Sequence, residues 1–155
     1  MHGVVGFSPG VFDLFHVGHL DVLRRADASC DRLVAGILTD ELAERLHGAR
    51  PIVPLIERME IVGDVRHVDR VVPLDEADLR GVMAGLGAAT LFTGRPDALV
   101  PEAAERGLAG AGVRVVRFTG TTETASPVLR AALTRGGGSG SGGRAAGDER
   151  RSSVA

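Results

Sequence analysis

Lysine, tryptophan and tyrosine are absent from this 155-residue sequence, which also holds a single cysteine, Cys30. Without lysine the chain has no residue for Schiff-base chemistry or for a phosphate-binding P-loop, and its 18 cations are all arginines. One cysteine excludes an intramolecular disulfide and a zinc finger built on cysteines. Aromatic residues make up only 3% of the chain, so a binder of single-stranded nucleic acid that works by base stacking is not expected.

Net charge and hydrophobic runs are also modest. The formal net charge is −2, so no broad basic surface is expected for nucleic acid or membranes. No apolar run reaches the 18 residues of a membrane span, and the start of the chain lacks the pattern of a signal peptide. We therefore expect a cytoplasmic protein with no nucleic-acid or membrane partner. The hydrophobic share of 44% is sufficient for a packed core.

The last twenty residues differ in composition from the rest. From Gly136 the sequence reads GGGSGSGGRAAGDERRSSVA, which is too poor in apolar side chains to offset its ordering entropy. It could be a natural tail, a linker to another domain or an engineered remnant. We expect residues 136–155 to be a disordered Gly/Ser-rich tail and residues 1–135 to form a single domain.

Within residues 1–135, short apolar runs alternate with segments of helical spacing. Leu79, Val82, Met83 and Leu86 follow the i, i+3, i+4, i+7 pattern of a helix with one buried face. Two more such faces run from Leu20 to Ala26 and from Leu55 to Val62, and Ser126-Pro127 predicts the start of a last helix through Leu133. The expected strands are Val4–Phe7, Leu33–Leu38, Val71–Val72, Thr90–Thr93 and Val113–Phe118.

This alternation predicts an α/β fold: a doubly wound parallel sheet of about five strands with helices on both faces. Ligands of such folds bind beyond the carboxyl ends of the strands, where loops meet helix N-termini. The first such junction is the loop expected from Ser8 to His19. Gly10 permits close backbone approach there, and Gly18 separates two imidazoles, His16 and His19.

His16 and His19 favour an anion site. His19 is expected near the start of the following helix, where free backbone N–H groups and the positive end of the dipole attract phosphate. Imidazoles titrate near neutral pH, so a bound phosphate favours their protonated, donor form. A zinc pair is the alternative, but His2, His47 and His67 offer no third ligand at a suitable spacing. Either histidine could also be a structural residue.

Residues 10–19, GVFDLFHVGH, resemble the HxGH signature of the cytidylyltransferase-like nucleotidyltransferase superfamily, and the glycerol-3-phosphate cytidylyltransferase type in particular. RHVDRVVP at Arg66–Pro73, ILTDE at Ile37–Glu41 and TETASPVLR at Thr122–Arg130 are similar to further hallmarks of that type. The resemblance spans most of residues 4–133. It implies a Rossmann-like enzyme that joins a nucleoside triphosphate to a phosphorylated alcohol and releases pyrophosphate.

The resemblance also implies roles for particular residues. His16 and His19 would be catalytic and would stabilise the α-phosphate in the transition state. Arginines would replace the lysines of the family at the acceptor and triphosphate sites. Asp13 would fix the loop or approach the metal, and Arg58 would make either an internal ion pair or a ligand contact. The implied nucleotide-binding residues are Val11, Phe12, Asp13, Gly18, Arg50, Thr124 and Ser126, and the implied acceptor-binding residues are Arg45 and Arg80.

No residue is expected to hold a metal of its own, and Mg²⁺ would be carried mainly by the triphosphate. The partners implied are CTP, a small phosphorylated or phosphonylated acceptor and a second copy of the chain in a homodimer. Two positions depart from the pattern: Thr121 replaces an arginine that grips the triphosphate, and Arg95-Pro96 stands where acidic residues face the base. Two alternatives therefore stay open, an ATP-dependent adenylyltransferase of the same superfamily and a nucleotide-binding module without turnover.

Overall fold

The computed structural model describes residues 3–95, 98–120 and 126–136. Its chain divides into two units, Met1–Thr124 and Ala125–Ala155. The first unit holds the sheet and five helices of the described chain, and the second contributes helix α6, Ser126–Gly136. The last helix expected from Ser126-Pro127 is confirmed. Residues 137–155 of the expected tail lie outside the described residues.

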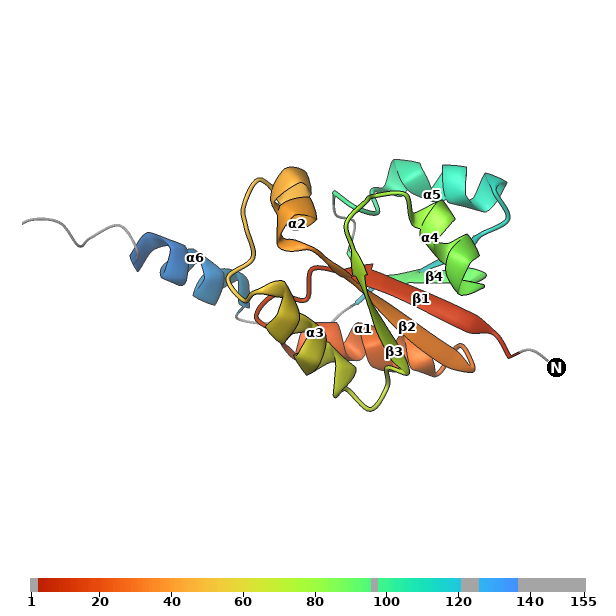
Figure 1. Ribbon diagram of the computed structural model, residues 1–155, viewed down its shortest axis with the longest axis horizontal. Helices are drawn as coiled ribbons and strands as arrows, with labels where there is room; N and C mark the ends of the chain where they lie inside the picture. The colour runs from red at the N-terminus through yellow and green to blue at the C-terminus, as the bar shows by residue number, and fades with distance from the viewer. Residues whose placement is uncertain (1–2, 96–97, 121–125, 137–155) are drawn as a thin grey trace, which may run out of the picture. The chain divides into compact units, whose positions relative to one another are not determined.

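Five parallel strands form one sheet in the order β3-β2-β1-β4-β5, which confirms the expected fold class (Figure 1). Its strands are β1 Val5–Gly10, β2 Arg32–Leu38, β3 Arg70–Leu74, β4 Thr90–Thr93 and β5 Arg114–Arg117. The helices between them are α1 Val17–Asp27, α2 Asp40–His47, α3 Leu55–Gly63, α4 Leu79–Leu86 and α5 Glu102–Gly110.

Helices cover both faces of the sheet, and each face has its own hydrophobic core (Figure 1). On one face α2, α4 and α5 pack against side chains such as Phe7 and Val34. On the other, α1 and α3 pack against Leu33, Ala35 and Ile37. Successive residues of β2 thus alternate between the two cores, as the two-residue period of a strand requires.

Two glycines allow the central strands to pack closely against phenylalanine rings. A Cβ atom at Gly36 would lie 2.6 Å from Cζ of Phe7, and one at Gly6 would lie 2.5 Å from Cε2 of Phe92. Both distances are shorter than a real Cβ contact, so a side chain at either position would displace a buried ring. These glycines let a sheet with few aromatic residues bury the ones it has.

The first strand is longer than the sequence suggested. We expected Ser8–Gly10 to belong to a loop, but these residues continue β1 and pair with Ala35, Gly36 and Ile37 of β2. The ladder with β4 covers Gly6 and Phe7, whereas the ladder with β2 runs on to Gly10. At Pro9, β1 is paired with β2 but not with β4. A residue without an N–H is tolerated where one side of a strand is unpaired.

No described helix is long and apolar enough to span a bilayer.

Candidate active site

The candidate site lies at the carboxyl ends of the strands, where the sheet changes direction. The chain moves from β1 to β2 and β3 on one side, and then returns to place β4 on the other side of β1. The end of β1 is therefore the switch point at which open α/β sheets bind ligands. The segment that leaves this point is the loop of residues 11–16, which we call the phosphate loop.

His16 and His19 come together at the end of this loop. His16 is the N-cap of α1, and its Nδ1 accepts a hydrogen bond of 3.1 Å from the Gly18 N–H. The two rings stack with their centroids 3.9 Å apart and their planes 25° apart. The cap uses the lone pair of Nδ1, so the neutral ring carries its proton on Nε2. The buried Gly18 supplies the amide for this bond.

Two phenylalanines position the ring of His19. The centroid of Phe12 lies 5.4 Å from that of His19 with an interplanar angle of 64°, and that of Phe15 lies 5.5 Å away at 42°. Phe12 is buried in the core beneath α1 and α3. The side chain of Phe12 is thus a packing group, so a phosphate contact by Phe12 would have to come from its backbone.

The backbone of the phosphate loop is strained on both sides of Asp13. Phe12 has a φ of 53° and Leu14 a φ of 49°, left-handed values that side chains disfavour. In the described chain these are the only residues other than glycine with positive φ. Such conformations persist where surrounding contacts over-determine them, and they cluster at functional sites.

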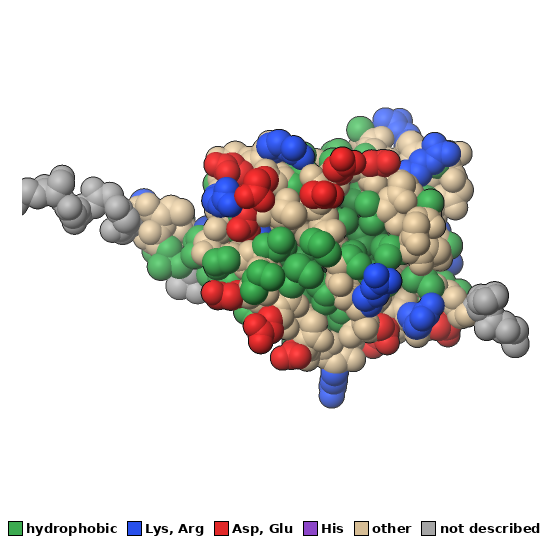
Figure 2. Space-filling model, viewed as in Figure 1, with side chains coloured by type: hydrophobic (Ala, Val, Ile, Leu, Met, Phe, Trp, Pro, Cys, Tyr) green, Lys and Arg blue, Asp and Glu red, His purple; other side chains and the backbone are tan. Residues whose placement is uncertain are grey.

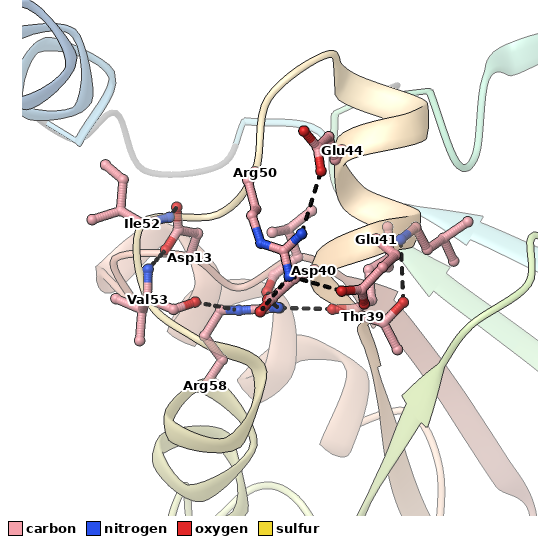
Figure 3. A network of polar contacts seen from close by, with 12 residues as sticks. Asp13, Thr39, Asp40, Glu41, Glu44, Arg50, Ile52, Val53 and Arg58 are labelled. Atoms are coloured by element: carbon pink, nitrogen blue, oxygen red, sulfur yellow. Dashed lines mark hydrogen bonds and ion pairs between the residues drawn. The ribbon is translucent and has the colours of Figure 1, made fainter.

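Asp13 holds the phosphate loop to the segment before α3. Its buried carboxylate accepts two backbone hydrogen bonds, 2.8 Å from the Ile52 N–H to Oδ2 and 2.9 Å from the Val53 N–H to Oδ1 (Figure 3). Of the two roles that the resemblance left open, the geometry therefore supports bracing of the loop. Contact with a metal ion is not required to explain this carboxylate.

Arg58 is a buried cation beside the phosphate loop. Its side chain is 0% exposed and forms an ion pair of 2.5 Å with Oδ1 of Asp40, the first residue of α2 (Figure 3). Its remaining bonds go to backbone carbonyls at the ends of β1 and β2 and before α3. Of the two roles expected for Arg58, the structure therefore supports the internal ion pair.

Arg50 lies above this network within an acidic group. Its Nη2 is 2.7 Å from Oε1 of Glu41, its Nη1 is 3.4 Å from Oε2 of Glu44, and its side chain is 52% exposed. Its pairing with the Glu41 carboxylate raises the pKa of Arg50. Figure 2 shows acidic and basic side chains intermingled around α2 rather than one continuous basic surface. Nucleotide binding by Arg50 would require it to exchange these carboxylates for phosphate, and this role stays a prediction.

The expected acceptor-binding arginines lie on the same side of the sheet. Arg45 is exposed on α2, and its Nη2 donates 3.2 Å to the carbonyl of Asp75, directly after β3. Arg80 is exposed in the first turn of α4. Thr124 and Thr121 lie outside the described residues, and Ser126 begins α6 in the second unit. The roles of these residues remain predictions.

Arg117 was not singled out as a site residue, yet it organises the segment after β4. It donates 2.7 Å to the carbonyl of Gly94 and 2.8 Å to that of Val100, and it pairs with Glu105 of α5. Its place at the end of β5, among the carboxyl ends of the strands, was the available signal. Pro96 and Asp97 of this segment lie outside the described residues.

The described part of the chain contains no group of three His, Cys, Asp or Glu side chains that could hold a metal ion.

Comparison with known proteins gives one family and several relatives. A family model described as cytidylyltransferase-like matches residues 7–106. The bifunctional protein HldE of Acidiphilium cryptum is 38% identical over 97 residues, which are 62% of this chain and 18% of that protein. HldE of Yersinia enterocolitica is 35% identical over 118 residues, 74% of this chain and 25% of that protein. The chain thus spans a quarter or less of the length of these two relatives.

Solved structures share the fold at low sequence identity. The lipopolysaccharide core biosynthesis protein of Thermoplasma volcanium has a TM-score of 0.68 and 23% identity, covering 79% of this chain and 100% of that one. The pantoate-beta-alanine ligase of Francisella tularensis, complexed with β,γ ATP and β-alanine, has a TM-score of 0.57 and 12% identity, covering 79% of this chain and 61% of that one. At these identities the two likenesses show the fold alone.

Proposed function

Because the chain belongs to the cytidylyltransferase-like family, we propose that it transfers a nucleoside monophosphate from a nucleoside triphosphate to a small phosphorylated acceptor. The single observation that carries this proposal is the stacked pair His16–His19 at the start of α1, directly beyond the switch point of the sheet. A helix N-terminus with two imidazoles beside it offers several donors to one phosphate group.

In the proposed reaction an oxygen of the acceptor phosphate attacks the α-phosphorus of the nucleotide. A new P–O bond forms to the acceptor, and the bond from the α-phosphorus to the bridging oxygen of the leaving group breaks, so that pyrophosphate departs with its electron pair. The acceptor phosphate is already ionised at neutral pH, so no general base is needed. The protein contributes alignment and stabilisation of the charge that builds up around the α-phosphorus.

The donors of that stabilisation are the imidazoles and the backbone of the phosphate loop. His16 would donate from Nε2 because Nδ1 is committed to the cap of α1. His19 would donate from a ring whose orientation Phe12 and Phe15 set. Arg50, Thr124 and Ser126 are proposed for the triphosphate, and Arg45 and Arg80 for the acceptor phosphate, where the guanidinium fork suits paired phosphate oxygens.

Mg²⁺ is proposed as the companion of the triphosphate. Mg²⁺ keeps most of its waters and binds chiefly to phosphate oxygens, so the triphosphate would hold it. When bound, the ion would neutralise charge on the leaving pyrophosphate. A homodimer is likewise part of the proposal, and it rests on the resemblance alone.

Two nucleotides are candidates. CTP is supported by the description of the family and by the sequence hallmarks. ATP is supported by the β,γ ATP bound to the pantoate-beta-alanine ligase, which shares the fold. The acceptor is a small molecule with a phosphate group, and sugar phosphates and glycerol phosphate are the first classes to assay.

The test is a pyrophosphate-release assay with all four nucleoside triphosphates and a panel of phosphorylated acceptors. We expect one triphosphate to be preferred, and His16→Ala and His19→Ala each to lower kcat by about 10²–10³-fold, as for loss of one preorganised donor. His16→Asn separates the two jobs of His16, because asparagine caps helices well but lacks the imidazole. It should fold like the wild type and lose turnover.

His47→Ala is the matched control, since His47 is exposed at the end of α2. Its turnover should equal that of the wild type. Wild-type turnover in both His16→Ala and His19→Ala would remove the proposed roles. Triphosphate binding without pyrophosphate release for any acceptor would favour a binding module without turnover.

A further inference from the structure

Below the phosphate loop, a closed circuit of hydrogen bonds joins residues that lie far apart in the sequence. We propose that Arg58 and Asp40 are positioning residues for nucleotidyl transfer: they hold the strained backbone of the phosphate loop in the geometry that receives the nucleotide. This inference rests on the proposed function, and it assigns to a buried ion pair a role in turnover beyond that in folding.

The circuit passes through a single residue of the segment before α3, Val53. The Val53 N–H donates to Asp13 of the phosphate loop at 2.9 Å, and the Val53 carbonyl accepts from Nε of Arg58 at 2.8 Å. Nη1 of Arg58 then donates 2.7 Å to the carbonyl of Val11, at the start of the same loop. Residues 11–13 are therefore held at both ends, by the Asp13 carboxylate and by the guanidinium.

Arg58 also fixes the surroundings of the loop. Its Nη1 donates a second bond, 2.9 Å, to the carbonyl of Leu38 at the end of β2, and its Nη2 binds Asp40 at the start of α2. One guanidinium thus joins the ends of β1 and β2, the beginning of α2 and the segment before α3. Four of its five N–H groups have acceptors within the chain, so Arg58 is not available as a ligand for substrate.

The strain in the phosphate loop explains why such bracing is needed. Phe12 and Leu14, on either side of Asp13, both adopt positive φ. Each such conformation is disfavoured for a residue with a side chain, so the loop would relax if it were released. Asp13 and Arg58 restrain the peptides around these two residues, and the loop keeps a backbone shape that the free chain would rarely adopt.

The chemistry of the brace also indicates a purpose beyond stability. Replacing a buried ion pair with well-packed apolar groups is often neutral or stabilising, so a buried arginine is a weak device for stability alone. A guanidinium, by contrast, directs several donors in a fixed plane and can set the positions of three carbonyls at once. The Arg58–Asp40 pair therefore fits the requirement for a precisely shaped backbone.

The experiment compares four variants, Arg58→Met, Arg58→Lys, Asp40→Asn and the matched control Val62→Ala. Val62 is buried on α3, as Arg58 is, but belongs to the core beneath the sheet. Two quantities are measured well below each melting temperature: kcat and KM for both substrates, and backbone hydrogen exchange by peptide mass spectrometry. Arg58→Lys keeps the charge with fewer donors, and Asp40→Asn keeps an acceptor without the charge, so each is a milder change that can be assayed if Arg58→Met does not fold.

We expect Arg58→Met to lower kcat by about 10²-fold, because an error of 1 Å in positioning has an effect of that size. KM for the acceptor should stay within about twofold, since the change is confined to the nucleotide side. Exchange should accelerate in residues 11–14 and 52–53 but not in β3 or α4. Arg58→Lys and Asp40→Asn should show the same pattern with smaller changes. Val62→Ala should lose stability without losing kcat.

Unchanged exchange in residues 11–14 in all three variants of the pair would overturn the proposal, whether or not the wild type has activity. Faster exchange there with a wild-type kcat would overturn it as well, because the pair would then be structural only. A wild type that releases no pyrophosphate would instead overturn the proposed function, and the role in turnover proposed for the pair would fall with it. Faster exchange there would then mark the pair as a structural brace of the loop.

Discussion

Single side chains in the candidate site often hold several parts of the fold together. The His16 ring caps α1 through Nδ1, and Nε2 is the atom proposed above to donate to the nucleotide. Asp13 uses both carboxylate oxygens on the backbone of Ile52 and Val53. Because these residues are committed to their neighbours before any ligand arrives, the site is pre-organised, and little rearrangement has to accompany binding.

Because the chain has no lysine, arginine alone makes the contacts that arginine and lysine share in most proteins. Arg58 and Arg117 each bind several carbonyls among the loops at the carboxyl ends of the strands, one beside β1 and the other beside β4. A lysine could not replace either one, because its ammonium is a compact group without a planar fork of donors. The absence of lysine from the sequence thus has a structural counterpart in these two braces.

A pH titration tests the acidic group around Arg50. A hydrogen bond from its own backbone N–H, and then the Arg50 guanidinium, lower the pKa of Glu41. Since folding lowers this pKa, the stabilising contribution is present above the ordinary glutamate range of about 4.3 and is lost as pH falls through the folded-state pKa. In Arg50→Gln, NMR should show the pKa of Glu41 moving up toward its ordinary value.

Arg45→Gln is the control for this titration, because Arg45 lies on the same helix but binds the Asp75 carbonyl. It should leave the pKa of Glu41 as it is in the wild type. An unchanged pKa in Arg50→Gln would show that the ion pair with Arg50 does not contribute to the pKa of Glu41 in solution, as for many exposed ion pairs.

Among the elements, α2 and α4 present their N-termini to the site and have similar boundaries. The side chains of Thr39 and Asp78 cap them, and each helix ends at a glycine with positive φ, Gly48 or Gly87. Left-handed glycines and side-chain caps are the common signals for helix ends. These two short helices therefore begin and end at defined residues, and their first turns keep a fixed place at the edge of the sheet.

Removing the cap of α4 should weaken the fold by a small and measurable amount. Oδ1 of Asp78 accepts a 3.1 Å hydrogen bond from the Gly81 N–H. Asp78→Ala should lower the free energy of unfolding by about 0.5–2 kcal/mol in urea, whereas Asp78→Asn should stay close to the wild type, because asparagine caps equally well. Equal stability of all three proteins would mean that water binds the N–H groups in the first turn of α4 as well as the Asp78 side chain does.

Elements with a periodic apolar face were predictable from the sequence, and others were not. The five strands were expected from their short apolar runs, α1, α3 and α4 from apolar residues at helical spacing, and α6 from the Ser126-Pro127 start signal. α2 was missed because its short, charged sequence follows β2 directly, with only the Thr39 cap between them. α5 has no fully buried residue, so it left no apolar stripe in the sequence.

In the candidate site, too, contacts between residues close in sequence were predictable, and contacts between distant segments were not. His16 and His19 were predictable because a spacing of three residues within one turn brings them together. The contacts of Asp13 with Ile52 and Val53, and of Arg58 with Val11, join segments about 40 residues apart, and only the folded chain shows them. The carboxylates around Arg50 were likewise not apparent from the sequence.

At the scale of the whole molecule, both hydrophobic cores lie within the first unit. Every described core residue, from Val5 to Phe118, precedes Thr124. A chain ending at Thr124 should therefore melt cooperatively within a few degrees of the full-length protein. It should also bind triphosphate more weakly if Ser126 contributes to the nucleotide site, as proposed.

Thermal denaturation followed by circular dichroism, and calorimetric titration with CTP and with ATP, measure these two properties. The control is a chain ending at Gly136, which keeps α6 and should match the full-length protein in both. A large loss of stability on truncation at Thr124 would show that the first unit depends on residues beyond it.

The central place of β1 in the sheet has a consequence for protein synthesis. A nascent chain can pair β1 with β2 once Leu38 has left the ribosome, but the partner on its other side, β4, appears only with Thr90. Until then an apolar strand edge stays open, which is a surface that attracts chaperones and other nascent chains. The switch point thus lies between the half of the sheet that is made early and the half that is made late, and it is complete only after translation has passed β4.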